Sequence, residues 1–296
     1  MRIIFCDSVF DNNIIEPDYE KEKNSALKNG LQFSLISYEE LVAGNTSKAL
    51  KNISKKESEE FGIYRGWMLT PEEYNNLFEG LLTKGIKLIN STSNYKHCHC
   101  LPESFHLIKL KTPKSVWTTN LDESNILKLA KEFGQNPIIL KDYVKSEKHN
   151  WEEACYIENA NDKSKVKSTV SKFLELRSNS LNQGIVFRQF EKLQFLTNHS
   201  QSGMPLTLEY RLFFLKGSLI NIFNYWDEGK YNDELPSLEG FKELAKTIES
   251  NFFTMDIAKK ENGEWIIMEL GDGQVSGLPD NADTDIFYYN LKENAL

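Results

Sequence analysis

The chain has 296 residues and a formal net charge of −8, from 43 acidic and 35 basic side chains. This length accommodates one large domain or two to three smaller ones, each able to bury a core. The acidic balance excludes the broad basic field of a general nucleic-acid binder. No run of about 18 apolar residues predicts a membrane-spanning helix, and the first ten residues lack a signal-peptide pattern. We therefore expect a cytoplasmic protein with neither nucleic acid nor a membrane as a partner.

Strand-like and helix-like patterns alternate in the first block of the chain, residues 1–92. Strands are expected at 2–6, 31–37, 62–67 and 86–89. A helix is expected after Thr70, because Pro71 suits the first helical position and Glu73 completes a capping box. An apolar stripe at helical spacing follows, made of Tyr74, Leu77, Phe78, Leu81 and Leu82. The alternation predicts an open, mostly parallel α/β domain.

Two further blocks, residues 93–190 and 191–296, mix strands and helices and are expected to form α+β lobes with antiparallel pairing. The first of them should contain strands at 115–118, 137–144, 154–157 and 184–190 and helices at 121–133 and 163–181. The second should contain strands at 206–215, 218–223, 252–258 and 264–270 and a helix at 238–248. The pairs Lys216-Gly217 and Asn262-Gly263 predict hairpin turns.

Six charged residues lie inside apolar strand-like runs. A buried charge is costly unless an opposite charge or a ligand compensates it. For any one of them the simpler interpretation is a solvent-facing position on a half-buried strand. As a set, their signs differ between blocks: the central block supplies the cations Lys141 and Arg188, and the last block supplies the acids Asp256 and Glu269. The six are Lys141, Arg188, Glu209, Arg211, Asp256 and Glu269.

Arginine is scarce, with five Arg against 30 Lys. A planar guanidinium suits carboxylates and phosphates, whereas Lys suits solvated surfaces. Three of the five, Arg65, Arg188 and Arg211, lie in strand-like runs. This placement favours anion recognition over a role in solubility.

Asp256 and Glu269 flank the Asn262-Gly263 turn and are expected to face each other on neighbouring strands. Two acids in this arrangement repel unless a cation lies between them. Mg²⁺ takes carboxylate oxygens, nucleotide phosphates and water as ligands. Cationic side chains aimed at the same place would neutralise those phosphates.

Several common catalytic motifs are absent from the sequence: it contains neither a Walker nor a Rossmann glycine pattern, and no G-x-S-x-G elbow. Residues 269–279 instead run from an apolar strand into a glycine-rich, acid-bearing segment. Its backbone is suited to approach a phosphate closely, or the segment is a plain surface loop. Trp67, Trp151 and Trp226 either line a pocket or belong to the core.

From about Arg65 to Pro279, the order of these motifs resembles the ATP-grasp superfamily, most of all its clade named for two arginines and a lysine. The resemblance implies an N-terminal α/β domain (1–92) followed by two α+β lobes that enclose ATP. The first lobe (93–190) would be the small ATP-grasp subdomain. The second (191–296) would carry the metal-binding acids.

The resemblance also implies nucleotide contacts. Residues 137–141 resemble the family strand whose Lys contacts the nucleotide, here Lys141, and Lys96 stands where the family often has its other nucleotide Lys. Residues 186–191 resemble the hinge that binds adenine, and Glu209 resembles the acid that binds ribose. The hinge residues are Gln189, Phe190 and Glu191.

For the reacting groups, the resemblance places Arg188 and Arg211 on phosphate or an acylphosphate, and Asp256 and Glu269 on Mg²⁺. Arg65 would clamp a substrate carboxylate from the first domain. Many relatives have Glu-x-Asn on the metal-binding strand, with both side chains as ligands. Here Gly271 follows Glu269 at that spacing and offers no side-chain donor, so Asp272 or Gln274 is the candidate replacement.

The activity implied is a two-step ligation that uses ATP and Mg²⁺. A carboxylate, on an anionic small molecule or a peptide, attacks the γ-phosphate to give an acylphosphate and ADP. An amine then displaces phosphate and forms an amide. Three alternatives stay open: a catalytically inactive module that binds nucleotide or a partner, an ATP-dependent phosphotransferase, and a structural protein whose strand charges are solvated.

Overall fold

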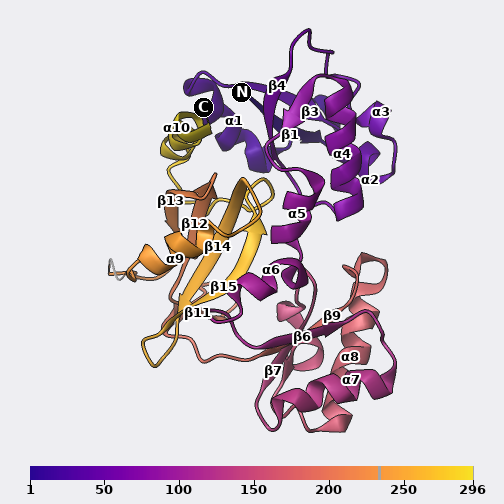
Figure 1. Cartoon of the computed structure of the whole chain (residues 1–296), viewed down its shortest axis with the longest axis vertical. Coiled ribbons are helices and arrows are strands. Elements are labelled where there is room, and N and C mark those ends of the chain that lie inside the picture. The colour runs from indigo at the N-terminus through magenta and orange to yellow at the C-terminus, as the bar shows by residue number, and fades with distance from the viewer. Residues whose placement is uncertain (233–234, 296) are drawn as a thin grey trace.

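The structure is a computed structural model that describes residues 1–232 and 235–295. It is elongated, with three groups of elements along its long axis (Figure 1). The N-terminal group lies at one end, the C-terminal sheet in the middle and the central group at the other end. Helices α5 (Thr92–His99) and α6 (Leu101–Ile108) pass beside the C-terminal sheet and connect the two ends.

A five-stranded sheet forms the N-terminal group. Strand β1 lies between β3 and β4 and runs parallel to both, and β4 pairs in parallel with β5. Strand β2 adds an antiparallel pairing at the end of β1 that its polar sequence did not predict. The strands are β1 (Arg2–Ser8), β2 (Asp11–Ile15), β3 (Gln32–Ile36), β4 (Glu60–Arg65) and β5 (Ile86–Leu88).

Helix α4 (Pro71–Thr83) begins with the predicted capping box. The backbone N–H of Glu73 donates to the Thr70 hydroxyl, and the backbone N–H of Thr70 donates to the Glu73 carboxylate. These bonds satisfy two of the four free N–H groups at the helix start. The other helices of this group are α1 (Glu20–Lys28), α2 (Tyr38–Val42) and α3 (Thr46–Ala49), and a 3₁₀ turn (Pro17–Tyr19) precedes α1.

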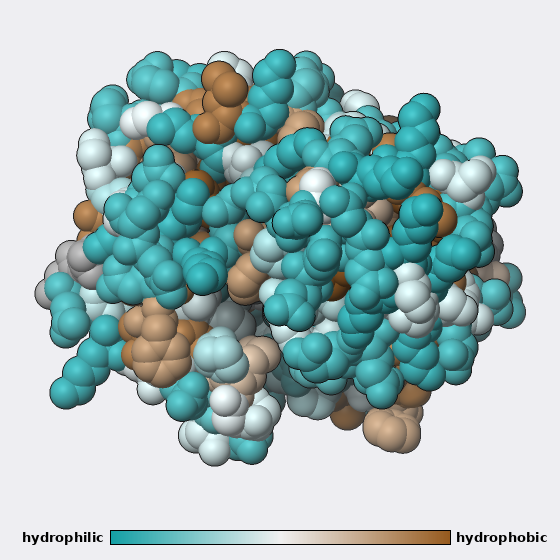
Figure 2. All heavy atoms as spheres, turned by 90° about the horizontal axis from the view of Figure 1, so that it is seen from below, coloured by the Kyte–Doolittle hydropathy of each residue, from teal (hydrophilic) through white to brown (hydrophobic). Residues whose placement is uncertain are grey.

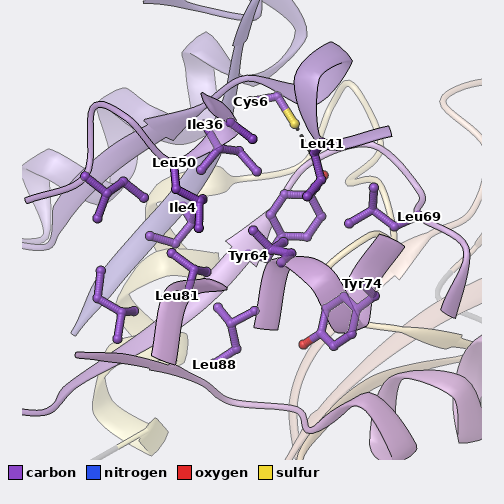
Figure 3. Close-up of a cluster of buried hydrophobic side chains, with 14 of the residues drawn as sticks. Ile4, Cys6, Ile36, Leu41, Leu50, Tyr64, Leu69, Tyr74, Leu81 and Leu88 are labelled. Carbon is purple, nitrogen blue, oxygen red and sulfur yellow. Dashed lines mark hydrogen bonds between the residues drawn. The ribbon is translucent and has the colours of Figure 1, made fainter. Parts of the chain in front are cut away.

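The apolar face of α4 packs on the first sheet around the ring of Tyr64 (Figure 3). The Tyr64 side chain comes from β4 and is fully buried, and its hydroxyl lies 3.3 Å from the Cys6 sulfur. Tyr74 of α4 lies in the same cluster, so the predicted stripe is the core face of the helix. All four cysteines of the chain are buried and unpaired.

The central group is a four-stranded antiparallel sheet in the order β6-β9-β7-β8, with α7 and α8 in one core with it. The expected strand at 154–157 is shorter, because Trp151–Cys155 form a turn of π-helix that buries Ala154 and Cys155 together. The elements are β6 (Ser115–Thr118), α7 (Glu123–Ala130), β7 (Ile138–Asp142), β8 (Tyr156–Ile157), α8 (Lys163–Arg177) and β9 (Ile185–Gln189), with 3₁₀ turns at Lys131–Phe133, Lys148–Asn150 and Ser178–Ser180.

The C-terminal sheet is antiparallel, in the order β13-β12-β14-β15, and α9 (Glu239–Ala245) packs on one face. The expected strand at 206–215 divides at Leu208, where the chain changes partners: the Leu208 N–H donates to the Gln194 carbonyl, and its own carbonyl accepts from Lys259. Residues before Leu208 form a separate hairpin. The strands are β10 (Phe195–Asn198), β11 (Pro205–Thr207), β12 (Glu209–Leu215), β13 (Ser218–Asn224), β14 (Phe252–Lys259) and β15 (Trp265–Asp272).

The N-terminal group and the C-terminal sheet share one hydrophobic core. Phe5 of β1 lies in the same cluster as Phe213 of β12 and Phe287 of the last helix, α10 (Thr284–Ala295), which packs beside α1 (Figure 1). The three larger sheets fall within the three expected segments, 1–92, 93–190 and 191–296, although the boundaries themselves stay a prediction.

Arg65, at the end of β4, is a second connection between these parts. Its guanidinium is 1% exposed and donates two hydrogen bonds of 2.8 Å to the Glu22 carboxylate of α1. It also donates to the carbonyls of Gly273 and Ser276, in the loop after β15. One buried side chain therefore holds α1, β4 and that loop together.

The surface at the central-group end is mostly hydrophilic, with apolar side chains in separate small groups (Figure 2). In the part of the chain that the structure describes, no helix is long and apolar enough to cross a membrane.

The variant Arg65→Met should lose about 3–5 kcal/mol of unfolding free energy, because it leaves the Glu22 carboxylate buried without its partner. Urea unfolding would measure the loss. Lys172→Met, which breaks an exposed pair with Glu175, is the control and should change stability by less than about 1 kcal/mol. An Arg65→Met variant as stable as this control would contradict the role of the pair.

Candidate active site

One face of the C-terminal sheet carries four charged side chains. Arg211 lies opposite Asp256 in the β12–β14 register, and Asp256 lies opposite Glu269 in the β14–β15 register. Residues directly opposite in antiparallel strands share a face, and so do residues two apart on one strand. Glu209 therefore joins the set from β12. The expected juxtaposition of Asp256 and Glu269 is present.

Arg211 and Asp256 form a two-bonded ion pair at the centre of this face. The guanidinium donates to both carboxylate oxygens, at 2.8 and 2.7 Å, and to the Gly277 carbonyl at 2.9 Å. Its carbon lies 4.8 Å from the centre of the Tyr225 ring. Asp256 is 4% exposed, and this burial raises its pKa, although Arg211 acts in the opposite direction.

Lys141 and Arg188 project from one face of the central sheet, on neighbouring strands β7 and β9. The Lys141 ammonium lies 2.8 Å from a carboxylate oxygen of Glu269, so an ion pair joins the two sheets. The Glu269 side chain is 42% exposed. Burial acts to raise its pKa, but the charges of Lys141, Arg188 and Arg211 outweigh burial and lower it.

Arg188 reaches the C-terminal sheet through hydrogen bonds to neutral groups. Its guanidinium donates to the carbonyl of Met268, at 2.6 Å, and to the hydroxyl of Thr112, at 3.0 Å. Burial lowers its pKa to about 10, against the attraction of Glu269 and Glu191. Arg188 therefore remains a cation at neutral pH and carries a positive charge into the interface between the sheets.

Residues 189–191 lie at the end of β9, beside the C-terminal sheet. The backbone N–H groups of Gln189 and Phe190 donate to the carbonyls of Lys114 and Pro137, so both are engaged in the central sheet. Gln189 donates through its amide to Glu191, which is also paired with Lys260. The ring of Phe190 packs edge-on against Trp151 and Tyr156. In the expected hinge, Phe190 therefore contacts aromatic rings and Glu191 contacts a lysine.

Glu209 is nearly fully buried and accepts a hydrogen bond from the Thr207 hydroxyl. Burial raises its pKa to about 7, while that hydrogen bond acts to lower it. Its carboxyl group therefore changes charge near neutral pH.

Lys148 and Trp226 belong to this region, although no role was predicted for Lys148. Lys148 follows β7 in a 3₁₀ turn of the central group, and its ammonium lies 5.7 Å from the centre of the Trp226 ring, which belongs to the loop after β13. Its charge acts to lower the pKa of both Glu209 and Asp256. A lysine in an irregular loop carries no periodic signal. The sequence showed only that Lys148 lies a few residues beyond the strand predicted at 137–144.

Three predicted site residues lie elsewhere. Arg65 does not face the cleft, because Glu22 and two loop carbonyls occupy its guanidinium. Asp272 does not join Asp256 and Glu269, because it projects from the opposite face of β15, is fully buried, and accepts hydrogen bonds from Asn90 and Gln274. Lys96 lies on α5, paired with Glu103 at 2.8 Å and 39% exposed.

Comparison with protein families identifies the family of this chain. The domain model of the ATP-grasp domain, R2K clade family 3, matches residues 132–291, more than half of the chain. The chain belongs to this ATP-grasp family. The match contains both lobes' charged strands, from Lys141 to Glu269. The resemblance expected from the motifs is confirmed.

Solved ATP-grasp structures share the fold at low sequence identity. D-cycloserine synthetase DcsG aligns over 99% of each chain, with a TM-score of 0.59 and 9% identity. ATP-grasp ligase PsnB, complexed with a precursor peptide and AMPPNP, aligns over 100% of this chain and 97% of its own, with a TM-score of 0.57 and 11% identity. D-alanyl-alanine synthetase A from Vibrio cholerae aligns over 99% of this chain and 98% of its own, with a TM-score of 0.55 and 11% identity. No curated protein sequence matches the chain. These structures confirm the expected ATP-grasp fold class.

The pH dependence of stability should report Glu209. On folding, the pKa of this carboxyl group rises from 4.5 to about 7. Its contribution to the free energy of unfolding is therefore complete below pH 4.5 and is lost as the pH rises through 7. The contribution is at most roughly 3 kcal/mol. Glu209→Gln should therefore flatten the decline in unfolding free energy between pH 5 and 8, measured by urea unfolding. Burial also raises the pKa of Asp272 to about 7, so the Glu209→Gln variant should retain the part of the pH dependence that Asp272 contributes. An unchanged slope in Glu209→Gln would contradict the assignment, and the exposed Glu293→Gln is the control.

Proposed function

We propose that this ATP-grasp protein is an ATP- and Mg²⁺-dependent carboxylate–amine ligase that forms an amide or peptide bond through an acylphosphate. The observation that carries the proposal is the meeting of two charged sheet faces. Lys141 and Arg188 bring positive charge from the central sheet to the carboxylates of the C-terminal sheet. A nucleotide triphosphate with a divalent cation has the complementary charges, because its phosphates suit the cationic side chains and its cation suits the carboxylates.

The donor set fits Mg²⁺. Asp256 and Glu269 lie side by side on neighbouring strands and supply carboxylate oxygens. In the described ranges, no group of three or more His, Cys, Asp or Glu side chains is placed to hold a metal ion. Mg²⁺ usually binds one or two carboxylates and completes its shell with phosphates and water. When bound, Mg²⁺ would offset phosphate charge.

Binding would exchange the present partners of these side chains. Lys141, freed from Glu269, would bind a phosphate oxygen, and Glu269 and Asp256 would turn to the cation. Arg211 would then stabilise the charge of the acylphosphate. We propose that Gln189, Phe190 and Glu191 bind adenine and that Glu209 binds ribose, because Glu191 connects the end of β9 to the C-terminal lobe, whose sheet carries Glu209. Arg188, held by Met268 and Thr112, would keep a fixed positive charge beside the phosphates.

The reaction needs positioning and charge neutralisation more than a protein nucleophile. A substrate carboxylate oxygen would form a bond to the γ-phosphorus while the bond to the bridging oxygen of ADP breaks. The amine nitrogen would then bond to the acyl carbon, and phosphate would leave with the electrons of the broken C–O bond. An amine that enters as an ammonium ion loses two protons: one leaves with phosphate as HPO₄²⁻, and the other passes to solvent.

The chemical class of the substrates follows from the same site. We propose an anionic small molecule or a peptide as the carboxylate donor, an amine as the acceptor, and the cytoplasm as the location. PsnB and the macrocyclase MdnC were solved with precursor peptides, which supports a peptide as one class to test.

One observation favours a second candidate, a module that binds nucleotide without turnover. Gly271 provides no side-chain ligand beside Glu269, and Asp272 faces away from the cleft. Such a module would bind ATP and Mg²⁺ but release no ADP with any carboxylate. A phosphotransferase would release ADP without free phosphate when carboxylate and amine are both supplied.

Lys141→Met should weaken ATP binding in the presence of Mg²⁺ by about 10–100-fold, because a cation that faces the phosphates is lost. Isothermal titration would measure the dissociation constant. Lys128→Met, on the exposed surface of the same lobe, is the control and should bind ATP as the wild type does. Equal affinity in both variants would remove Lys141 from the nucleotide site.

Asp256→Asn should reduce Mg²⁺-dependent ADP release at least about 100-fold, because it removes one of two charged ligands and half of the Arg211 pair. A screen of amino acids and peptides with ATP and Mg²⁺, followed by mass spectrometry of the product, would supply the substrates. Glu261→Gln, in the exposed turn after the same strand, is the control. Turnover of Asp256→Asn near the wild-type rate would mean that the metal assignment is wrong.

A further inference from the structure

Arg188 is a buried cation whose hydrogen bonds all go to neutral groups. It is 6% exposed, and in the part of the chain that the structure describes no carboxylate forms an ion pair with it. Its three hydrogen bonds leave from one nitrogen, Nη2, and go to the Thr112 hydroxyl and the carbonyls of Ile267 and Met268. The charge of the guanidinium is therefore held in place without being cancelled.

The two carbonyls belong to a β-bulge in β15. Ile257 of β14 lies opposite Ile267. The preceding residue, Asp256, lies opposite Glu269, so Met268 has no partner on β14. In a regular strand, successive carbonyls point to opposite sides of the strand. Here the carbonyls of Ile267 and Met268, at 3.3 and 2.6 Å, accept from the same guanidinium nitrogen. The extra residue of the bulge therefore turns a second carbonyl toward the central lobe.

Thr112 connects this bulge to Arg188. Its hydroxyl donates to the Ile267 carbonyl at 2.7 Å and accepts from the guanidinium at 3.0 Å. The Ile267 N–H in turn donates to the Lys111 carbonyl at 2.7 Å, so the backbone beside Thr112 is fixed to β15 as well. Thr112 is 8% exposed. Because the single hydrogen of its hydroxyl serves the carbonyl, the lone pairs of the oxygen serve the guanidinium.

We propose that Thr112 is a positioning residue: with the bulge at Met268, it holds Arg188 away from Glu269 and so leaves that carboxylate to the divalent cation. The inference rests on the nucleotide and metal site of the proposed function, and it adds a role for the neutral groups around that site. A guanidinium forms its strongest hydrogen bonds with a carboxylate, often two at once. Without its neutral acceptors, Arg188 would turn to Glu269, whose charge attracts it.

Glu269 is the acid that the cation needs free, because the other acid is already shared. Asp256 accepts from Arg211 through both of its carboxylate oxygens. Glu269 binds the Lys141 ammonium through one oxygen, and a phosphate can take over this ammonium. A second cation on Glu269 would compete with Mg²⁺ for the remaining oxygen.

The variant Thr112→Val removes the hydroxyl and keeps the shape of the side chain. The dissociation constant of Mn²⁺ in the presence of saturating AMPPNP should rise at least about 10-fold, because Arg188 then pairs with Glu269. Electron paramagnetic resonance of free Mn²⁺ would measure it. Thr112→Ser keeps the hydroxyl and should bind Mn²⁺ as the wild type does. The matched control is Thr169→Val, because the Thr169 hydroxyl is buried in α8 and makes no hydrogen bond to the described part of the chain.

A double-mutant cycle separates positioning from a merely structural effect. In an Arg188→Met background, Thr112→Val should leave the dissociation constant of Mn²⁺ unchanged, because the hydroxyl acts only through the guanidinium. A crystal structure of metal-free Thr112→Val gives a readout that needs neither metal nor turnover. It should show the Arg188 guanidinium within about 4 Å of the Glu269 carboxylate.

Four outcomes overturn the inference: Thr112→Val binds Mn²⁺ as the wild type does, it loses affinity for AMPPNP equally with and without Mn²⁺, its loss is as large in the Arg188→Met background, or Arg188 keeps its position in the crystal structure. The ligase function stands in each case if the wild type releases ADP with a carboxylate. If Mn²⁺ affinity depends on Thr112 through Arg188 but no carboxylate yields ADP, the ligase function fails and the inference stands.

Discussion

The contact between the central sheet and the C-terminal sheet depends on the compensation of buried charge. A charge removed from water must find an opposite charge or a set of dipoles nearby, or the fold loses stability. The buried Asp256 pairs with Arg211 within its own sheet, and the buried Lys141 pairs with Glu269 on the opposing sheet. The second pair therefore also fixes how the two lobes face each other. In the proposed complex, nucleotide phosphates would face Lys141 and the metal ion would face Glu269, so both members of that pair would gain a new partner.

The N-terminal group contributes to the site by holding the loop after β15. Arg65 binds two carbonyls of this loop, the Tyr64 N–H donates to the Gln274 side chain, and Asn90 binds Asp272. The loop then presents the Gly277 carbonyl to Arg211. Through this loop, the buried Arg65 helps to position Arg211 on the charged face of the C-terminal sheet.

Much of this arrangement could be predicted from sequence, because strand alternation and hairpin turns determine which residues share a face. The opposition of Asp256 and Glu269 followed from the turn between them. The same parity puts Asp272, three residues after Glu269, on the other face, so that assignment conflicted with the pattern itself. Arg65 was expected to clamp a substrate carboxylate, and its pairing with Glu22 could not be predicted, because Glu22 lies on a helix that has no apolar stripe. Lys148 depends on how an irregular loop bends, which local sequence does not determine.

The contact between α1 and α10 has a consequence for folding during synthesis. Ser25 bonds Thr284 across 259 residues of chain, and Phe5 shares a core with Phe287. At roughly 5–20 residues per second, a ribosome needs on the order of 10–50 s between making these two segments. Through that interval, the first sheet lacks the helix and the strands that cover part of its apolar surface. The N-terminal group is therefore made first, but its core is completed last.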